Sequence, residues 1–280
     1  MCPKPWPRSP ESTSTEGPVG IFWVGLNGSI AAAVEPFGYL AGSSMKRIRQ
    51  IRVSWAVAGA LCTLPLLGRA QTVHTRLNDA PYPFLAVAQD ASYFEGGAPL
   101  LLFLHGRSLS GTDLSKVRKY GPIDAMERGL DVEALVIAPQ LKPGERWEPE
   151  KVIEVVNAAQ RLYGTDSCRV YVAGMSLGGY GTMDFVGTYP DRVEAAVAIC
   201  GGGTEGLACG LAETRLWIQH GTLDRHVPHA ESVKMHEAVK ACREDAPCML
   251  TLHPDCDHGK IAREFYRGGL YAWLFRGEAP

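Results

Sequence analysis

The 280-residue sequence predicts an α/β fold, in which helices cover both faces of a mostly parallel central sheet. Hydrophobic residues make up 46% of the chain and charged residues 21%, which is enough apolar material for one sizeable core. From about residue 80 onward, short apolar segments alternate with segments that carry apolar residues at helical spacing. Most of the short segments are continuously apolar, as expected for strands that are buried on both faces.

Each element can be placed in order along the chain. Residues 100–104 (LLLFL) are apolar throughout and end at His105-Gly106, and residues 150–163 carry apolar residues along one helical face before Gly164. The segment 176–189 is a predicted helix that stops before Pro190. The predicted strands are residues 82–90, 100–104, 134–138, 169–173, 195–199, 216–219 and 249–253. The predicted helices are residues 123–128, 150–163, 176–189, 229–242 and 261–275.

The N-terminal segment differs in composition from this domain. Residues 1–18 are rich in Pro, Ser, Thr and Glu and are predicted to be disordered. Residues 45–70 combine a basic start, an apolar stretch over 53–67 and small residues before a cleavage site after Ala70, as a secretory signal peptide does. A short uncleaved membrane anchor is the alternative, but the apolar stretch is shorter than the roughly 20 residues that span a bilayer. We therefore expect a secreted or periplasmic protein, a single folded domain over 71–280, and a start at Met45 that would leave residues 1–44 untranslated.

Charge and cysteine content narrow the possibilities further. The formal net charge of −2 gives no basic surface for nucleic acid, and the sequence after residue 70 predicts no stable membrane insertion. Six of the eight cysteines follow residue 70, an even number that suits disulfides in an exported domain. Because a bridge requires Cα atoms within about 7 Å, cysteines at opposite ends of the sheet should not pair. We predict a bridge between Cys242 and Cys248 at the bottom, one at the top joining Cys209 to either Cys200 or Cys256, and one free thiol at each end.

The strongest functional signal is Gly174-Met175-Ser176-Leu177-Gly178, which lies between a predicted buried strand and a predicted helix. A serine at such a turn is held in a strained conformation with its hydroxyl above the sheet, and the tight turn demands small residues at Gly174 and Gly178. The N-terminal amides of the following helix favour a developing negative charge. This context predicts Ser176 as a nucleophile rather than a residue of a purely structural turn.

A serine nucleophile needs a base, and the base needs a carboxylate that orients it. His258 follows the last predicted strand, and Asp224 follows the strand before it, so both lie where ligands bind parallel sheets. The alternative carboxylates are those of Asp184, Asp191, Asp255 and Asp257, and His253 is expected to be packed within its strand. His226, His229 and His236 surround a helix start and are expected to be surface or capping residues, since no carboxylate or cysteine completes a metal site there. We expect no metal and no other cofactor.

Two backbone N–H groups are expected to stabilise the oxyanion. The first is that of Leu177, directly after the nucleophile. The second is that of Arg107, in the loop after the strand 100–104, although His105-Gly106 could simply turn the chain there.

Together, the segments 100–106, Pro139-Gln140 with Trp147, 169–179 with Tyr180-Gly181, and 220–228 resemble α/β hydrolases of the dienelactone-hydrolase and prolyl-oligopeptidase-related esterase group. The sequence is most similar to exported proteins described as predicted peptidases, phospholipase/carboxylesterases or polyhydroxybutyrate-depolymerase-like esterases, and the resemblance covers about residues 80–275. It implies the α/β-hydrolase fold and Ser176, Asp224 and His258 as the catalytic triad of a carboxylesterase. Dienelactone hydrolases proper carry cysteine at the position of Ser176, so dienelactone activity is not implied. Many relatives also carry an acidic residue in the loop 107–111 that is missing here, so the resemblance does not define the acyl-side pocket.

The expected substrate is a small-molecule ester or an ester linked to a polysaccharide. We expect Gln140, Trp147 and Tyr180 to contact it, with Trp147 forming a wall for a sugar or an aromatic group or else packing structurally. The alternatives to an esterase are a serine peptidase of the prolyl-oligopeptidase-like group and a non-catalytic binding protein with a hydrolase fold.

Overall fold

A computed structural model describes residues 72–76 and 80–279, and the predicted disordered segment and signal peptide lie outside the described residues. The strands are β1 (Thr72–Arg76), β2 (Phe84–Ala88), β3 (Leu100–Leu104), β4 (Leu135–Pro139), β5 (Val170–Met175), β6 (Ala195–Ile199), β7 (Arg215–Gly221) and β8 (Cys248–His253). The α-helices are α1 (Pro122–Glu127), α2 (Pro149–Tyr163), α3 (Leu177–Thr188), α4 (Ala208–Leu211), α5 (Ala230–Cys242) and α6 (Gly268–Arg276). Short 3₁₀ helices include η2 (Arg107–Leu109), η3 (Leu114–Arg118), η5 (Glu205–Leu207) and η6 (Lys260–Tyr266).

The eight strands form one sheet in the order β1-β2-β4-β3-β5-β6-β7-β8. β1 and β2 are antiparallel to their neighbours, and the remaining strands are parallel. Strands β2 to β6 are buried along their whole length, which explains their continuously apolar sequences. The predicted mostly parallel sheet is therefore confirmed.

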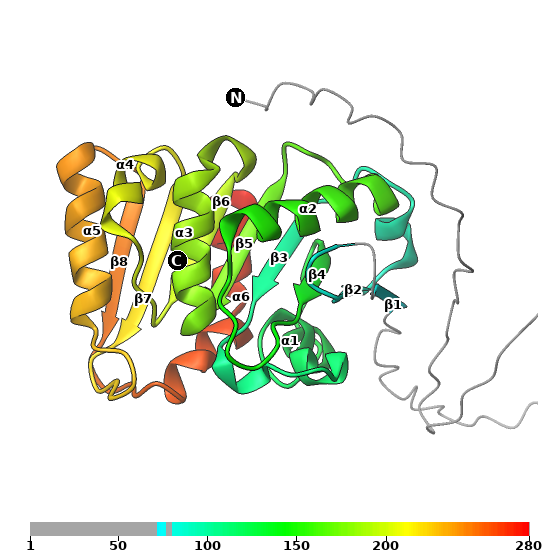
Figure 1. Ribbon diagram of the computed structural model, residues 1–280, viewed down its shortest axis with the longest axis horizontal. Coiled ribbons are helices and arrows are strands. Elements are labelled where there is room, and N and C mark those ends of the chain that lie inside the picture. Colours follow the sequence, from blue (N-terminus) through cyan, green and yellow to red (C-terminus); the bar gives the residue numbers. More distant parts are fainter. Residues whose placement is uncertain (1–71, 77–79, 280) are drawn as a thin grey trace, which may run out of the picture.

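Helices cover both faces of this sheet (Figure 1). One apolar core contains residues of α2, α3 and α5, among them Val156, Met183 and Val239. The other contains residues of α1, η6 and α6, among them Ile123, Phe265 and Trp273. Because each face of the sheet contributes alternate side chains to one core, the strands are fixed in register from both sides.

The strand order reverses next to β3, and this reversal positions the site. The chain passes from β3 to β4 on one side and then crosses back to β5 on the other side of β3. In open α/β sheets, ligands bind in the crevice beyond the carboxyl ends of the strands at such a reversal. The segments at this crevice are the turn after β3, which begins at His105, and the turn after β5, which contains Ser176.

Some elements differ from the sequence prediction, among them β1 and the C-terminal helix. β1 was not predicted, although it pairs with β2 along its whole length. The last predicted helix, residues 261–275, is two elements, η6 and α6, separated by an extended Arg267 (φ −107°, ψ 123°). Gly268 and Gly269 follow that residue, and glycine weakens a helix by about 1 kcal/mol relative to alanine. The helix is therefore interrupted there, although the apolar periodicity of the sequence continues.

The predicted disulfide pairing was wrong. Cys209 bonds to Cys242, with Cα atoms 5.2 Å apart, whereas Cys200, Cys248 and Cys256 are free thiols. Cys209 was placed at the top of the sheet because it follows β6. It lies instead in α4, which packs against α5 and precedes β7, so the chain has already returned to the bottom edge there.

Among the described residues, none of the helices is both long and apolar enough to cross a membrane.

Gly174 and Gly178 flank the Ser176 turn, and each lies too close to backbone atoms to carry a side chain. A Cβ at Gly178 would lie 1.7 Å from the carbonyl oxygen of Leu104, and one at Gly174 would lie 2.2 Å from that of Gly178. Both obstacles are backbone atoms, which cannot turn aside as a flexible side chain would.

Replacing Gly178 by alanine should therefore lower the free energy of unfolding by about 3 kcal/mol or more, because β3 and α3 must move apart. Urea denaturation measures this loss. Gly206→Ala is the matched control, since nothing lies within 4 Å of a Cβ there. If both variants unfold at the urea concentration that unfolds the wild type, the close approach of α3 to β3 is wrong.

Candidate active site

Ser176 occupies the sharp turn between β5 and α3. Its backbone has φ 58° and ψ −118°, a conformation that costs a non-glycine residue about 1–3 kcal/mol and recurs at functional sites. The turn is held by hydrogen bonds from Ser176 N–H to the carbonyl of Ile199 (2.8 Å) and from Tyr180 N–H to the carbonyl of Ser176 (3.1 Å). The residue lines a pocket of about 620 Å³.

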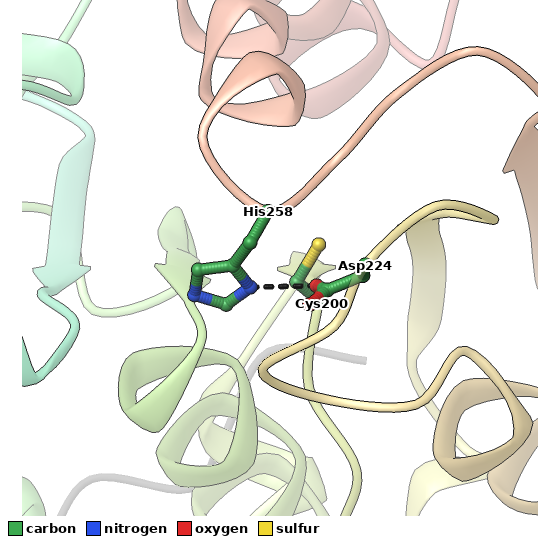
Figure 2. A group of neighbouring side chains, drawn as sticks. All are labelled: Cys200, Asp224 and His258. Atoms are coloured by element: carbon green, nitrogen blue, oxygen red, sulfur yellow. Dashed lines mark hydrogen bonds and ion pairs between the residues drawn. The ribbon is translucent and has the colours of Figure 1, made fainter.

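Asp224 and His258 meet beside this turn. The Nδ1 atom of His258 lies 2.6 Å from Oδ2 of Asp224. In Figure 2 this nitrogen faces the carboxylate, and the other ring nitrogen points away from it. Oδ1 of Asp224 accepts hydrogen bonds from the N–H groups of His226 (2.8 Å) and Val227 (2.9 Å). The Asp224 side chain is completely buried, so its orientation is set by these contacts.

The other candidate carboxylates do not reach His258 in this way. Asp257 is exposed and accepts from the N–H groups of Gly259 and Lys260 in its own loop. Asp255 and Asp191 are exposed, and Asp184 accepts from the N–H group of Thr204. His253 lies half-buried in β8 with its Nε2 atom 3.1 Å from Gln219 Oε1.

The hydrogen bonds to Asp224 also determine its charge. Burial acts to raise the pKa of this carboxyl, but hydrogen bonds from Val227 N–H, His258, Cys200 and His226 N–H outweigh burial and lower the pKa to about 2. Asp224 is therefore ionised at neutral pH and can stabilise an imidazolium at His258.

The lowered pKa predicts how stability depends on pH. A carboxyl whose folded pKa lies below its ordinary value of 3.8 contributes stability above that value and loses it as the pH falls toward 2. The free energy of unfolding should therefore fall more between pH 5 and about pH 2 in the wild type than in Asp224→Asn, as urea titrations at each pH would measure. Equal slopes for the two proteins would contradict this charge assignment.

His258 shares the pocket with Ser176. Its side chain is 20% exposed, and its ring centroid lies 5.1 Å from that of His226, which also lines the pocket. An imidazole held at Nδ1 by an ionised carboxylate keeps its proton on that nitrogen, which leaves Nε2 as a base facing the pocket. His226 was expected to be a surface or capping residue, but it lines this pocket.

Cys200 was missed as a site residue by the sequence reasoning, which considered it only for disulfides. It follows β6 directly, has a positive φ of 49° and is fully buried. Its thiol is hydrogen-bonded to Asp224, and burial raises the pKa of the thiol, so the neutral S–H group donates to the carboxylate. The available signal was its position immediately after a strand next to β7.

The same three side chains form the one group among the described residues that could hold a metal ion. Cys200, Asp224 and His258 place a sulfur, an oxygen and a nitrogen atom within 4.8 Å of one another. A cation such as Zn²⁺ would have to displace the protons on the thiol and on Nδ1 of His258, because metals bind the deprotonated forms. In the structure Nδ1 of His258 is hydrogen-bonded to Asp224 (Figure 2), and the Cys200 thiol lies beside the same carboxylate.

His220 and Ser232, which were not predicted as site residues, hold the loop of Asp224 through hydrogen bonds. His220 is completely buried, with Nδ1 2.7 Å from Ser232 Oγ and Nε2 3.0 Å from the carbonyl of Val227. Ser232 in turn donates to the carbonyl of Gly201 (2.7 Å). This chain of contacts joins the ends of β6 and β7 to the start of α5.

Arg107 and Leu177 both lie on the pocket at the first position of a helix. The N–H groups of a helix's first turn have no partner within their own helix. Two such groups from different helices, η2 and α3, therefore lie at this pocket, and their role as an oxyanion site stays a prediction.

Of the three residues expected to bind substrate, only Tyr180 lines the pocket. Gln140 is buried, and its Nε2 donates to the carbonyls of Leu109 and Asp113 (2.8 Å each). Trp147 is buried too, and its Nε1 donates to the carbonyl of His105 (3.1 Å). Both side chains were misassigned because they follow a strand end in sequence, whereas they face inward and brace the loops after β3.

No protein-family model and no curated protein matches this sequence. The structure, in contrast, resembles many solved structures. A thermostable esterase matches with a TM-score of 0.59 and 22% identity over 74% of this chain, which spans 62% of the esterase. A dienelactone hydrolase from Klebsiella pneumoniae subsp. pneumoniae MGH 78578 matches with a TM-score of 0.56 and 18% identity, over 75% of this chain and 100% of that one. A feruloyl esterase module from Clostridium thermocellum matches with a TM-score of 0.57 and 14% identity, over 76% of this chain and 91% of that one.

These neighbours belong to the α/β-hydrolase superfamily, and the chain has the α/β-hydrolase fold that its sequence motifs implied. At these identities the likeness concerns the fold, whereas the chemistry depends on the residues of the pocket.

Proposed function

We propose that this protein is a serine carboxylic-ester hydrolase with Ser176, His258 and Asp224 as its catalytic triad. The observation that carries the proposal is the 2.6 Å contact between His258 Nδ1 and Asp224 Oδ2, in a pocket that Ser176 also lines from a strained turn. A binding protein would need neither the strain nor the buried carboxylate. The esterases and other hydrolases among the structural neighbours support a hydrolase.

The reaction follows from the positions of these groups. His258 Nε2 removes the proton of the Ser176 hydroxyl as its oxygen attacks the ester carbonyl, and Asp224 stabilises the imidazolium that forms. The N–H groups of Arg107 and Leu177 hold the oxyanion of the tetrahedral intermediate. His258 then gives its proton to the leaving alcohol, and a water molecule activated by the same nitrogen releases the acid from Ser176.

The pocket favours an ester with an apolar or aromatic part. Its lining includes the aromatic rings of Tyr120 and Tyr180 and the apolar side chains of Met175, Leu177 and Val227. The site opens to solvent beside the exposed residues Arg107 and Ser108, so a bulky alcohol, such as a sugar of a polysaccharide, can extend outward. We propose small aromatic or short-chain esters, free or linked to a polysaccharide, as the substrate class.

Incubation of the full chain with p-nitrophenyl acetate, p-nitrophenyl butyrate and methyl ferulate tests the function. In parallel, a fluorophosphonate probe followed by peptide mapping identifies the nucleophile, with Ser176 as the expected site. Hydrolysis of a peptide amide but not of these esters would replace the esterase by a peptidase. A folded protein that neither hydrolyses an ester nor reacts with the probe would support a non-catalytic binding role.

A further inference from the structure

The turn that carries Arg107 is held by a side chain from a distant segment. Gly106 N–H donates to the phenolic oxygen of Tyr120 at 2.7 Å. Tyr120 lies between η3 and α1 and lines the same pocket as Ser176. The contact therefore fixes the peptide immediately before the N–H group proposed to bind the oxyanion.

The space around Gly106 is narrow. A Cβ at Gly106 would lie 2.9 Å from the Tyr120 hydroxyl, 3.1 Å from the carbonyl oxygen of Met175 and 3.2 Å from Cβ of Ser176. The glycine is thus enclosed between the phenol and the nucleophile turn. From the other side, buried His105 donates from Nδ1 to the carbonyl of Gly106 (2.7 Å) and accepts at Nε2 from Leu141 N–H (3.1 Å).

The phenol itself is rigidly placed. Its ring packs edge-on against that of Phe103, with ring centroids 5.8 Å apart, and lies tilted against that of Phe265, with centroids 6.4 Å apart. The next residue, Gly121, has φ 95°, and a Cβ there would lie 2.4 Å from the Phe103 ring, so the chain passes tightly over that side chain. A side-chain hydrogen bond to Ser108 completes the contacts, and burial raises the pKa of Tyr120, which keeps the phenol neutral.

We propose that Tyr120 is a positioning residue for ester hydrolysis, which holds the Gly106 peptide so that the Arg107 N–H group points at the oxyanion. The inference rests on the proposed esterase function. Without the phenolic oxygen, Gly106 N–H loses its acceptor and the turn gains freedom to rotate. Because the oxyanion forms only in the transition state, the loss should fall on kcat and leave KM nearly unchanged.

Tyr120→Phe tests the proposal, because it removes one oxygen atom and keeps the ring packing. Tyr266→Phe is the matched control: it also removes a phenol that makes a hydrogen bond, in this case to Asp124 Oδ2 at 2.6 Å on α1. For p-nitrophenyl butyrate, kcat of Tyr120→Phe should fall about 10- to 100-fold, less than the loss of a whole oxyanion donor. Binding of 1-butaneboronic acid, which forms a tetrahedral adduct with a serine hydroxyl, should weaken in parallel, whereas Tyr266→Phe should match the wild type in both measurements.

A Tyr120→Phe variant with wild-type kcat, or with a raised KM and unchanged kcat, would overturn the positioning role. If thermal denaturation shows that this variant is unfolded, Ser108→Ala, which leaves Tyr120 in place but removes its side-chain partner, should show a smaller loss of kcat and of boronate affinity. Wild-type values for Ser108→Ala in that case would count against the proposal. Absence of ester hydrolysis by the wild type would instead reject the esterase itself, and the two failures are thus separable.

Discussion

Replacing Ser176 by alanine is expected to lower kcat for p-nitrophenyl butyrate by about 10⁴- to 10⁶-fold, the range found when a triad serine is removed. The physical reason is that Ser176 presents its hydroxyl from the strained turn between β5 and α3, in the pocket that His258 also lines. What activity remains should come from the N–H groups of Arg107 and Leu177 acting on an attacking water molecule. Steady-state hydrolysis with active-site titration of the wild type gives the ratio.

Ser110→Ala provides the control for this variant. Ser110 follows η2 and lines a neighbouring hollow rather than the pocket of Ser176, so its removal should leave kcat and KM unchanged. Probe labelling should disappear in Ser176→Ala and persist in Ser110→Ala. Retention of hydrolysis and of labelling in Ser176→Ala would show that another nucleophile acts in this pocket.

The second large effect is expected for Asp224→Asn, with a loss in kcat of about 10⁴-fold. An asparagine can still accept from the N–H groups of His226 and Val227 through its amide oxygen, so the loop should keep its conformation. Its amide nitrogen would then face His258 Nδ1 as a donor, which places the imidazole proton on Nε2. In that tautomer the imidazole cannot accept the proton of Ser176.

Asp257→Asn discriminates between this explanation and a general effect of charge near His258. Asp257 neighbours His258 in sequence but accepts only from backbone N–H groups of its own loop, and asparagine can replace it there. We expect wild-type kinetics for this variant, measured across the pH range together with Asp224→Asn. A large loss in Asp257→Asn and none in Asp224→Asn would reassign the acid of the triad.

Local patterns were enough to predict most of the scaffold. Strands β3 and β6 have the predicted bounds because a continuously apolar pentapeptide between polar turns is buried wherever it packs. The Ser176 turn was predictable for a similar reason, since its two glycines, its preceding strand and its following helix are contiguous in sequence. The order in which the strands end then indicated Asp224 and His258 as its partners.

Other features depended on contacts between segments far apart in sequence. Gln140 and Trp147 were expected at the substrate and instead brace the loops after β3, because the pattern of a loop does not tell which side chains turn inward. The pairing of Cys209 with Cys242 required knowing where α4 returns to the bottom of the sheet.

The amino-acid sequence by itself thus determined the parallel sheet, the Ser176 turn and the identity of the residues that meet there, because burial and turn geometry restrict the residue type locally. Only the tertiary structure decided which further side chains hold these residues in place. Cys200 donates to Asp224, His220 supports its loop, and Tyr120 holds the Gly106 peptide. Each is a single hydrogen bond between segments that the sheet topology brings together, and no period or spacing in the sequence records such a contact.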